Sequence, residues 1–248
     1  TALPQLLDEQ KFKLQQEMLS CDLVVYETSA GKQFEISNEG GKSQEFAVTD
    51  VYRHGFMDAK RLNALVFDET GIEWRTTDYS EYDPFIEGFH QVLTKLMNAL
   101  SFQAHARVKE IALSYVDMIV PEDGSTLNDY FSGIINMPVP EQFKVGVFSA
   151  GSTSISNVIE PNLKIDISLE QLPQKFKKYL PESAMEIDEK FGMNIINPYT
   201  LSDIDGSEYA LLMTRASRLV DIKLGDLNCV EESKPLHLIT KETFYKVI

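Results

Sequence analysis

The chain has 248 residues, of which 43% are hydrophobic and 25% charged, so its composition is that of a globular protein and not of a disordered one. Its 38 acidic and 23 basic residues give a net charge of −15. This charge argues against direct binding to nucleic acid or to an anionic membrane surface, because both require a basic face. It is compatible with a basic protein partner, although most acidic proteins are simply soluble ones.

Targeting and redox features indicate a cytoplasmic protein. No segment approaches 18 consecutive apolar residues, and the first residues lack the charged and then apolar pattern of a signal peptide. The two cysteines, Cys21 and Cys229, lie far apart and form no Cys-x-x-Cys pair, which argues against a disulfide framework and a zinc site. A reducing cytoplasm is the simplest location, and we expect no metal and no cofactor.

The first predicted elements form an antiparallel meander with helices. Residues 68–71 (Asp-Glu-Thr-Gly) are typical of a hairpin turn between two strands, and 30–31 is a second predicted turn. The predicted elements are a helix over 3–19, strands over 21–28, 34–37, 46–52, 62–67 and 71–77, and a loop over 38–43.

The next element is an amphipathic helix over 84–100. Asp83 is predicted to cap its start, and Pro84 suits the first helical position, where a missing N–H is no loss. Apolar residues recur at intervals of three and four and share one face of this helix: Phe85, Phe89, Val92, Leu93, Leu96 and Leu100.

A strand follows over 111–120, with period-two alternation and two largely apolar faces, which predicts a central position in a sheet. Asp117 is the exception on its face. It is either a buried acid with a raised pKa or a strand-end carboxylate that bonds loop backbone or reaches solvent.

The remaining sequence predicts a second α+β half. The segment 121–141 is long and irregular, and a Ser- and Gly-rich turn spans 149–156. Further predictions are strands over 143–147, 155–160 and 163–168, a basic helix over 169–179, a hairpin over 209–214 and 218–224, a loop over 225–235 and a terminal helix over 236–248.

The predicted fold is therefore α+β, with antiparallel sheets and packed helices in two halves, 1–121 and 122–248, which one continuous domain could also contain. Both 62–100 and 209–248 read as strand, turn, strand, loop and helix. Two similarly built halves, produced by duplication, would explain this repetition.

Aromatic residues and histidines supply the candidate site residues. Trp74, Tyr79 and Tyr82 are close in sequence and form either a binding wall or the rim of a core. His90 borders the apolar helix face, and His237 near a helix start could meet Cys229 or an acid in space. No histidine pair has the spacing of metal ligands on one element, and none of the common catalytic or phosphate-binding motifs occurs.

One part of the chain resembles a known family. The run from Gly71 (Gly-Ile-Glu-Trp-Arg-Thr-Thr-Asp-Tyr) and the run from Ser114 (Ser-Tyr-Val-Asp-Met-Ile) are similar to a sporadically distributed family of uncharacterised prokaryotic proteins of this length, over about 62–130. That family usually carries Arg-Tyr-x-Asn-Arg-Ile; here Tyr115 and Ile119 are kept, Asp117 replaces Asn, and both arginines are absent. The resemblance implies an α+β fold, a prokaryotic or phage-related source and no established activity.

Two hypotheses about function follow. The first is a non-enzymatic interaction module that neutralises or regulates a basic partner such as a toxin, in an immunity or defence role. The second is a hydrolase-type enzyme with a carboxylate and histidine site between the two halves, for which the candidates are Asp117, Tyr115, His237 and His90. Convergence of these side chains in a deep cleft favours the enzyme, whereas a flat acidic or apolar surface favours the module.

Overall fold

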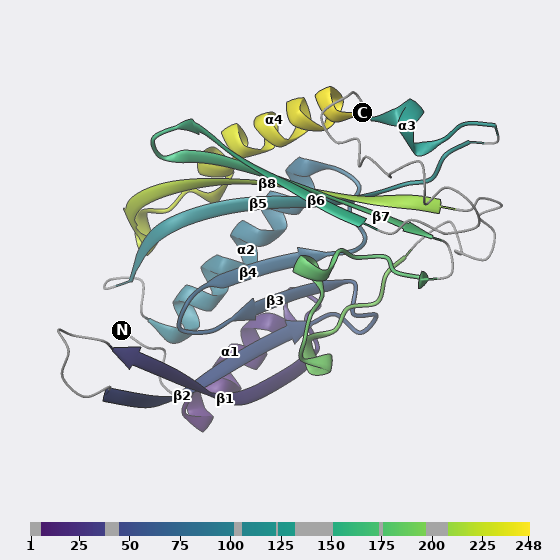
Figure 1. The fold of residues 1–248 in the computed structure, drawn as a ribbon. Helices are drawn as coiled ribbons and strands as arrows, with labels where there is room; N and C mark the ends of the chain where they lie inside the picture. Colours follow the sequence, from purple (N-terminus) through teal and green to yellow (C-terminus); the bar gives the residue numbers. More distant parts are fainter. Residues whose placement is uncertain are drawn as a thin grey trace. The chain divides into compact units, whose positions relative to one another are not determined.

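The structure, a computed structural model, has an α+β fold with two roughly similar halves, each built on a four-stranded antiparallel sheet with packed helices (Figure 1). The predicted fold class is therefore confirmed. The structure describes residues 6–37, 45–101, 106–122, 124–131, 151–173, 176–196 and 208–248. The chain forms two compact units, the first made of 1–102 and 186–196 and the second of 103–185 and 197–248.

The first unit contains a meander in which each strand pairs with the next, in the order β1-β2-β3-β4. Asp68 closes the β3–β4 hairpin as predicted, because its Oδ1 accepts hydrogen bonds from the backbone N–H groups of Thr70 and Gly71 at 2.7 and 3.1 Å. The elements are α1 (Asp8–Leu19), β1 (Val25–Ser37), β2 (Glu45–Met57), β3 (Asn63–Phe67), β4 (Ile72–Thr76), α2 (Tyr82–Leu100) and η4 (Glu189–Phe191).

Two local predictions in this unit are wrong. β1 continues through Gly31, which pairs with Val51 in the ladder, so no turn forms at 30–31. Helix α2 begins at Tyr82 with Glu81 at its N-cap position, so Asp83 lies in the first turn and does not cap the helix. An acid in the first turn still interacts favourably with the helix dipole.

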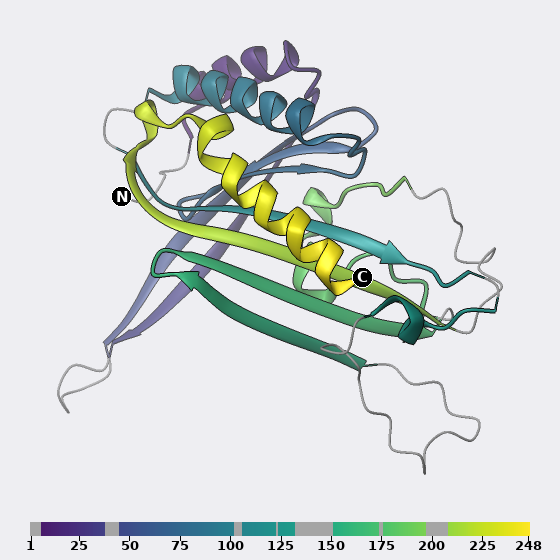
Figure 2. The same cartoon turned by 90° about the horizontal axis from the view of Figure 1, so that it is seen from above.

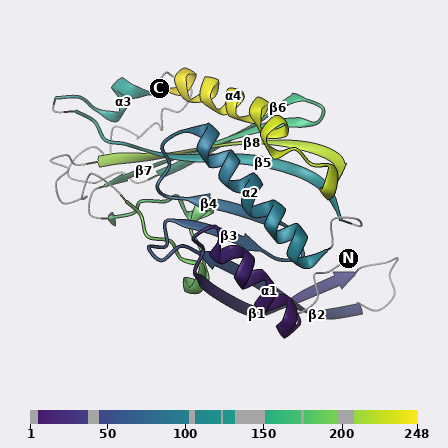
Figure 3. The same cartoon turned by 180° about the vertical axis from the view of Figure 1, so that it is seen from behind.

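The core of the first unit lies between the sheet and the helices α1 and α2, which pack side by side on one face (Figure 2, Figure 3). The predicted stripe of α2 supplies Val92, Leu93 and Leu96, all at most 3% exposed. Phe56 and Phe67 of the sheet are equally buried. Tertiary packing of this apolar face is the main source of the stability of such a helix.

Residues 186–196, which we call the strap, belong to the first unit although second-unit sequence flanks them. Phe191 of the strap is fully buried against Met57, Ala64 and Val66 of the sheet. No periodic pattern predicts an element for the strap, which contains the short 3-10 turn η4 and packs through contacts distant in sequence.

The second unit contains an antiparallel sheet with the strand order β5-β8-β7-β6. Helix α4 packs across β5 and β8 (Figure 2). The elements are β5 (Arg107–Ile119), α3 (Leu127–Tyr130), β6 (Gly151–Glu160), β7 (Leu163–Pro173), η3 (Glu182–Ala184), β8 (Glu208–Lys223), η5 (Leu224–Asp226) and α4 (Cys229–Val247).

The prediction that the strand over 111–120 is central is wrong, because β5 is an edge strand. Leu113 and Ile119 are buried on the face that α4 covers. Ala112 and Ser114, on the other face, are exposed. Small residues such as these occur both in cores and at surfaces, so their presence did not reveal that this face is exposed.

Other corrections in this unit concern where elements begin and end. β8 is one strand of 16 residues and not a hairpin, and β7 runs to Pro173 where a basic helix was predicted. β6 begins at Gly151, inside the predicted turn, and α4 begins at Cys229, inside the predicted loop. The predicted strand at 143–147 and the predicted loop at 38–43 lie outside the described residues.

The two units share a three-strand meander followed by a helix, β2-β3-β4-α2 in the first and β6-β7-β8-α4 in the second. They differ in the remaining strand, since β1 pairs with β2 whereas β5 pairs with β8. The predicted boundary at 121 therefore differs from the observed division, which comes before β5. No helix in the described parts of the chain combines the length and the apolar character that crossing a membrane requires.

Candidate functional site

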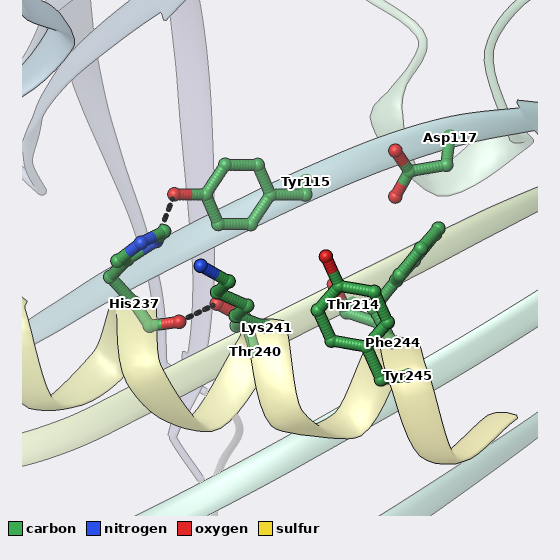
Figure 4. A pocket seen from close by; sticks show the side chains of 8 residues that line it. All are labelled: Tyr115, Asp117, Thr214, His237, Thr240, Lys241, Phe244 and Tyr245. Atoms are coloured by element: carbon green, nitrogen blue, oxygen red, sulfur yellow. Dashed lines mark hydrogen bonds between the residues drawn. The ribbon is translucent and has the colours of Figure 1, made fainter. Parts of the chain in front are cut away.

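A small pocket in the second unit, between α4 and the strands β5 and β8, contains three of the four predicted catalytic candidates (Figure 4). Its volume is about 140 Å³. Its lining residues are Tyr115, Asp117, Thr214, His237, Thr240, Lys241, Phe244 and Tyr245.

Regular secondary structure positions these side chains. Tyr115 and Asp117 are two residues apart on β5, so they project from one face about 7 Å apart. Thr214 of β8 pairs directly with Tyr115 in the ladder. On α4, His237 and Lys241 are four residues apart and therefore lie on one side of the helix.

Tyr115 and His237 form a hydrogen bond of 2.9 Å between the phenol oxygen and Nδ1. The two rings are tilted by 57° with their centroids 6.0 Å apart. Either group can donate, since the imidazole tautomer sets the direction of this bond. The bond fixes both polar groups at one end of the pocket, where a proton can pass between them.

The carboxyl group of Asp117 is half-buried, and burial raises its pKa above the ordinary value. Among the described residues, no side chain or backbone group forms a hydrogen bond or ion pair with it. Lys241 lies at the exposed rim, and its ammonium nitrogen forms no ion pair within 4.0 Å of the Asp117 carboxylate oxygens. Asp117 thus combines a raised pKa, as in the first alternative, with access to the open pocket, and it bonds no loop backbone among the described residues.

The sequence did not identify Thr214, Lys241 or Tyr245 as site residues. Lys241 and Tyr245 follow His237 at intervals of four on α4, and this spacing is the one signal that could have identified them. Thr214 is only 1% exposed, and its place in the pocket depends on the pairing of β8 with β5.

The other candidates belong to the first unit, and none of them is among the lining residues of this pocket. His90 is exposed on α2. Trp74 is half-buried, with its ring facing Gly88 of α2, so it forms part of the packing between sheet and helix. Tyr79 is 43% exposed and lies edge-on to Phe85, with the ring centroids 6.0 Å apart.

Negative charge is concentrated in the first unit. Its sequence holds 20 acidic and 10 basic residues, a net charge of −10, whereas the second unit holds 18 and 13, a net charge of −5. Residues 68–87, which we call the acidic segment, contain seven acids and Arg75 as their one base. The acids are Asp68, Glu69, Glu73, Asp78, Glu81, Asp83 and Glu87.

Arg75 neutralises only one carboxylate of the acidic segment. Its guanidinium forms ion pairs with Glu73 at 2.6 Å and with Glu186 of the strap at 2.7 Å. The exposed carboxylates of Asp78, Glu81 and Glu87 are therefore left to interact with solvent or with a partner.

The described residues offer no obvious metal or thiol chemistry. No group of three or more His, Cys, Asp or Glu side chains gathers among them in a way that could hold a metal ion. Cys229 is buried, and burial raises its pKa to about 11, so its thiol is protonated at neutral pH.

Comparison with known proteins gives no match: no family model, curated protein or solved structure matches the chain. The resemblance to the sporadically distributed prokaryotic family thus stays a prediction. Function is inferred from the residues of the chain itself.

Proposed function

We propose that this protein is a non-enzymatic interaction module that binds a basic protein partner, such as a toxin, and neutralises or regulates it. The acidic segment carries this proposal, because it presents seven acids against one base, and that base is already paired within the first unit. A surface of one sign of charge steers an oppositely charged partner into contact and selects against acidic ones.

Tyr79 adds a contact of a different kind to the acidic segment. Its ring is partly exposed and is held against Phe85, so little conformational entropy is lost when a partner covers it. Partly exposed aromatic residues are frequent centres of binding energy at interfaces. Trp74 and Tyr82, the other predicted binding residues, belong to the same segment. The ring of Trp74 packs against α2 at Gly88.

A cytoplasmic location and an immunity or defence role are part of this proposal. The net charge of −15 and the resemblance to a sporadically distributed prokaryotic family support them.

The test is a pull-down from the native host with three forms of the full chain. The first is wild type, and the second replaces four exposed acids of the acidic segment (Asp78→Asn, Glu81→Gln, Asp83→Asn and Glu87→Gln). The third is a control with the same loss of charge at exposed positions of the second unit (Glu160→Gln, Asp226→Asn, Glu231→Gln and Glu242→Gln).

Wild type and the control are expected to retain one basic protein at about 0.1 M salt and to release it at several-fold higher salt, because exposed charges are screened. The variant of the acidic segment is expected to retain little of it. Equal recovery by all three forms, or recovery of background proteins only, would contradict the proposal.

A hydrolase-type enzyme is the second candidate, and the pocket favours it. The Tyr115–His237 hydrogen bond and the nearby Asp117 carboxyl group form an arrangement suited to proton transfer. Tyr115 and Asp117 belong to the predicted half 1–121 and His237 to the predicted half 122–248, and all three lie within the second compact unit. His90 takes no part in this arrangement.

Screening of ester, phosphoester and amide substrates tests this second candidate. If the protein is a hydrolase, Tyr115→Phe, His237→Asn and Asp117→Asn should each lower kcat by about 100-fold or more, the usual contribution of general acid–base catalysis. His90→Asn serves as the matched control and should leave kcat unchanged. Activity that survives all three pocket substitutions would exclude the pocket as its source.

A further inference from the structure

We infer that the pocket beneath α4 binds a small zwitterion, an α-amino acid of the size of glycine, alanine or serine. The ammonium group of the ligand lies at the Asp117 end, and its carboxylate lies at the end formed by Lys241 and His237. This inference depends on the pocket of the second unit and not on the partner binding proposed for the acidic segment.

The first reason is that the pocket holds two opposite charges that do not pair with each other. Among the described lining residues, Asp117 is the one acid and Lys241 the one permanently charged base. No ion pair within 4.0 Å joins them, and neither forms an ion pair with another described residue. A ligand with one charge of each sign satisfies both groups at once, which a simple cation or a simple anion cannot do.

The second reason is that the two ends of the pocket differ in chemistry. Figure 4 shows Lys241 and His237 toward one end and Asp117 toward the other, with Phe244 and Tyr245 nearer to Asp117. Aromatic faces and a carboxylate together favour an ammonium group. The Lys241 ammonium is one donor for a ligand carboxylate, and the tautomer of His237 decides whether its Nε2–H or the phenol O–H of Tyr115 is the other.

The third reason is the environment of the Asp117 carboxyl group. Burial raises its pKa because no cation compensates the charged form. A ligand ammonium within hydrogen-bond distance supplies that cation and favours ionisation. The hydroxyl of Thr214, at the base of the pocket, is placed to share in these contacts.

The fourth reason is size. The pocket volume is about 140 Å³, whereas sites for drug-sized ligands have roughly 300–1,000 Å³. The smallest amino acids match this volume, and larger side chains would have to extend past the exposed rim at Tyr245.

Isothermal titration calorimetry on the full chain tests the inference with glycine, alanine and serine as probes. Propionate and propylamine, which each carry one of the two charges of alanine, serve as matched analogues. We expect at least one of the three amino acids to bind, and both analogues to bind at least tenfold more weakly than that amino acid.

Substitutions then assign the two ends. Asp117→Asn and Lys241→Met should each weaken amino-acid binding at least tenfold, while Lys234→Met, on an exposed position of the same helix, and the exposed Asp226→Asn should leave it unchanged. Circular dichroism and thermal melts confirm that each variant is folded before titration.

Three results would overturn the inference. Propionate binding as tightly as alanine, with no effect of Asp117→Asn, would identify an anion site. Propylamine binding as tightly as alanine, with no effect of Lys241→Met, would identify a cation site. Absence of heat and of any melting shift with all three amino acids at tens of millimolar would show that the pocket does not take this class of ligand. None of these results bears on the pull-down, so the two proposals fail independently.

Discussion

Phe191 packs so closely over Gly55 that a Cβ atom at residue 55 would lie 2.5 Å from ring carbon Cδ1 and 2.8 Å from Cε1. The same ring also contacts Arg53, whose guanidinium carbon is 4.8 Å from the ring centroid. The ring is fully buried. Glycine at position 55 is thus required by the close approach of the strap to β2.

Gly55→Ala is expected to lower the free energy of unfolding by about 2 kcal/mol, because the methyl group forces Phe191 out of its site and overpacks the core. Urea denaturation followed by fluorescence measures this loss. Gly31→Ala is the control, since a Cβ at Gly31 on the neighbouring strand β1 meets nothing within 4 Å. Equal stability of the two variants would mean that the strap does not constrain position 55.

Glu186 fixes one end of the strap through two arginines. Arg53 donates two hydrogen bonds to its carboxylate at 2.6 and 2.9 Å, and Arg75 donates one at 2.7 Å. Although burial opposes ionisation, these bonds lower the pKa of Glu186 from 4.5 to about 2. The group therefore stabilises the fold fully above pH 4.5, and this contribution is lost as the pH falls toward 2.

Glu186→Gln is expected to destabilise the protein by about 2 kcal/mol at pH 7, because two partly buried guanidinium groups lose their shared carboxylate. Chemical denaturation at pH 7 and pH 3 should show this difference shrinking at the lower pH. Glu73→Gln removes a more exposed partner of Arg75 and should cost less than about 1 kcal/mol. A larger effect at Glu73 than at Glu186 would contradict this assignment.

His54 is buried beneath the helices and bonds through Nδ1 to the phenol of Tyr26 at 2.9 Å. Burial, with a smaller effect from Lys11, lowers its pKa from 6.5 to about 4. Because the unfolded chain takes up this proton more readily than the folded chain, stability is full above pH 6.5 and falls as the pH drops toward 4. Between pH 7 and pH 5 the loss amounts to about 2 kcal/mol.

His54→Gln should remove this part of the pH dependence, measured as the free energy of unfolding at pH 7, 6 and 5. His90→Gln, at an exposed position of α2, should retain the slope of the wild type. Loss of the slope in the His90 variant, or its persistence in the His54 variant, would assign the titration to another group.

The pH dependence that Asp117 contributes to stability is opposite in sign to that of His54. Because its pKa is raised in the folded state, its ionisation destabilises the fold as the pH rises past the ordinary value of about 4. Asp117→Asn should therefore increase the free energy of unfolding at pH 7, and the gain should disappear near pH 3. Thermal melts of this variant beside the exposed Asp226→Asn check the prediction, and a decrease in stability would reveal a partner for the carboxylate.

The elements that the sequence predicts well are those fixed by contacts close in the chain. The apolar spacing over 84–100 led to α2 within two residues of its start, and the turn at Asp68 depends on hydrogen bonds two and three residues away. The errors occur where distant contacts decide. β8 is continuous because β5 and β7 hold it on both sides, and β7 runs to Pro173 because Glu208 of β8 pairs with that residue.

The pocket shows the same division. Period-two alternation placed Tyr115 and Asp117 on one strand face, and residue type drew attention to His237. His237 reaches Tyr115 because α4 packs on β5. His90, by contrast, is exposed on α2 in the first unit. Thr214 enters the pocket only because β8 is the neighbour of β5, a pairing that no local pattern reveals.

The strap has a consequence for how the protein is made. The ribosome synthesises the chain from the N-terminus to the C-terminus. All strands of the first unit therefore emerge from it long before Phe191 does. Until residue 196 has been synthesised, the face of the sheet formed by Met57, Ala64 and Val66 lacks its cover. The first unit therefore reaches its native state only after β5, β6 and β7 have also emerged, and a fragment that ends at residue 102 carries an uncovered apolar surface prone to aggregation.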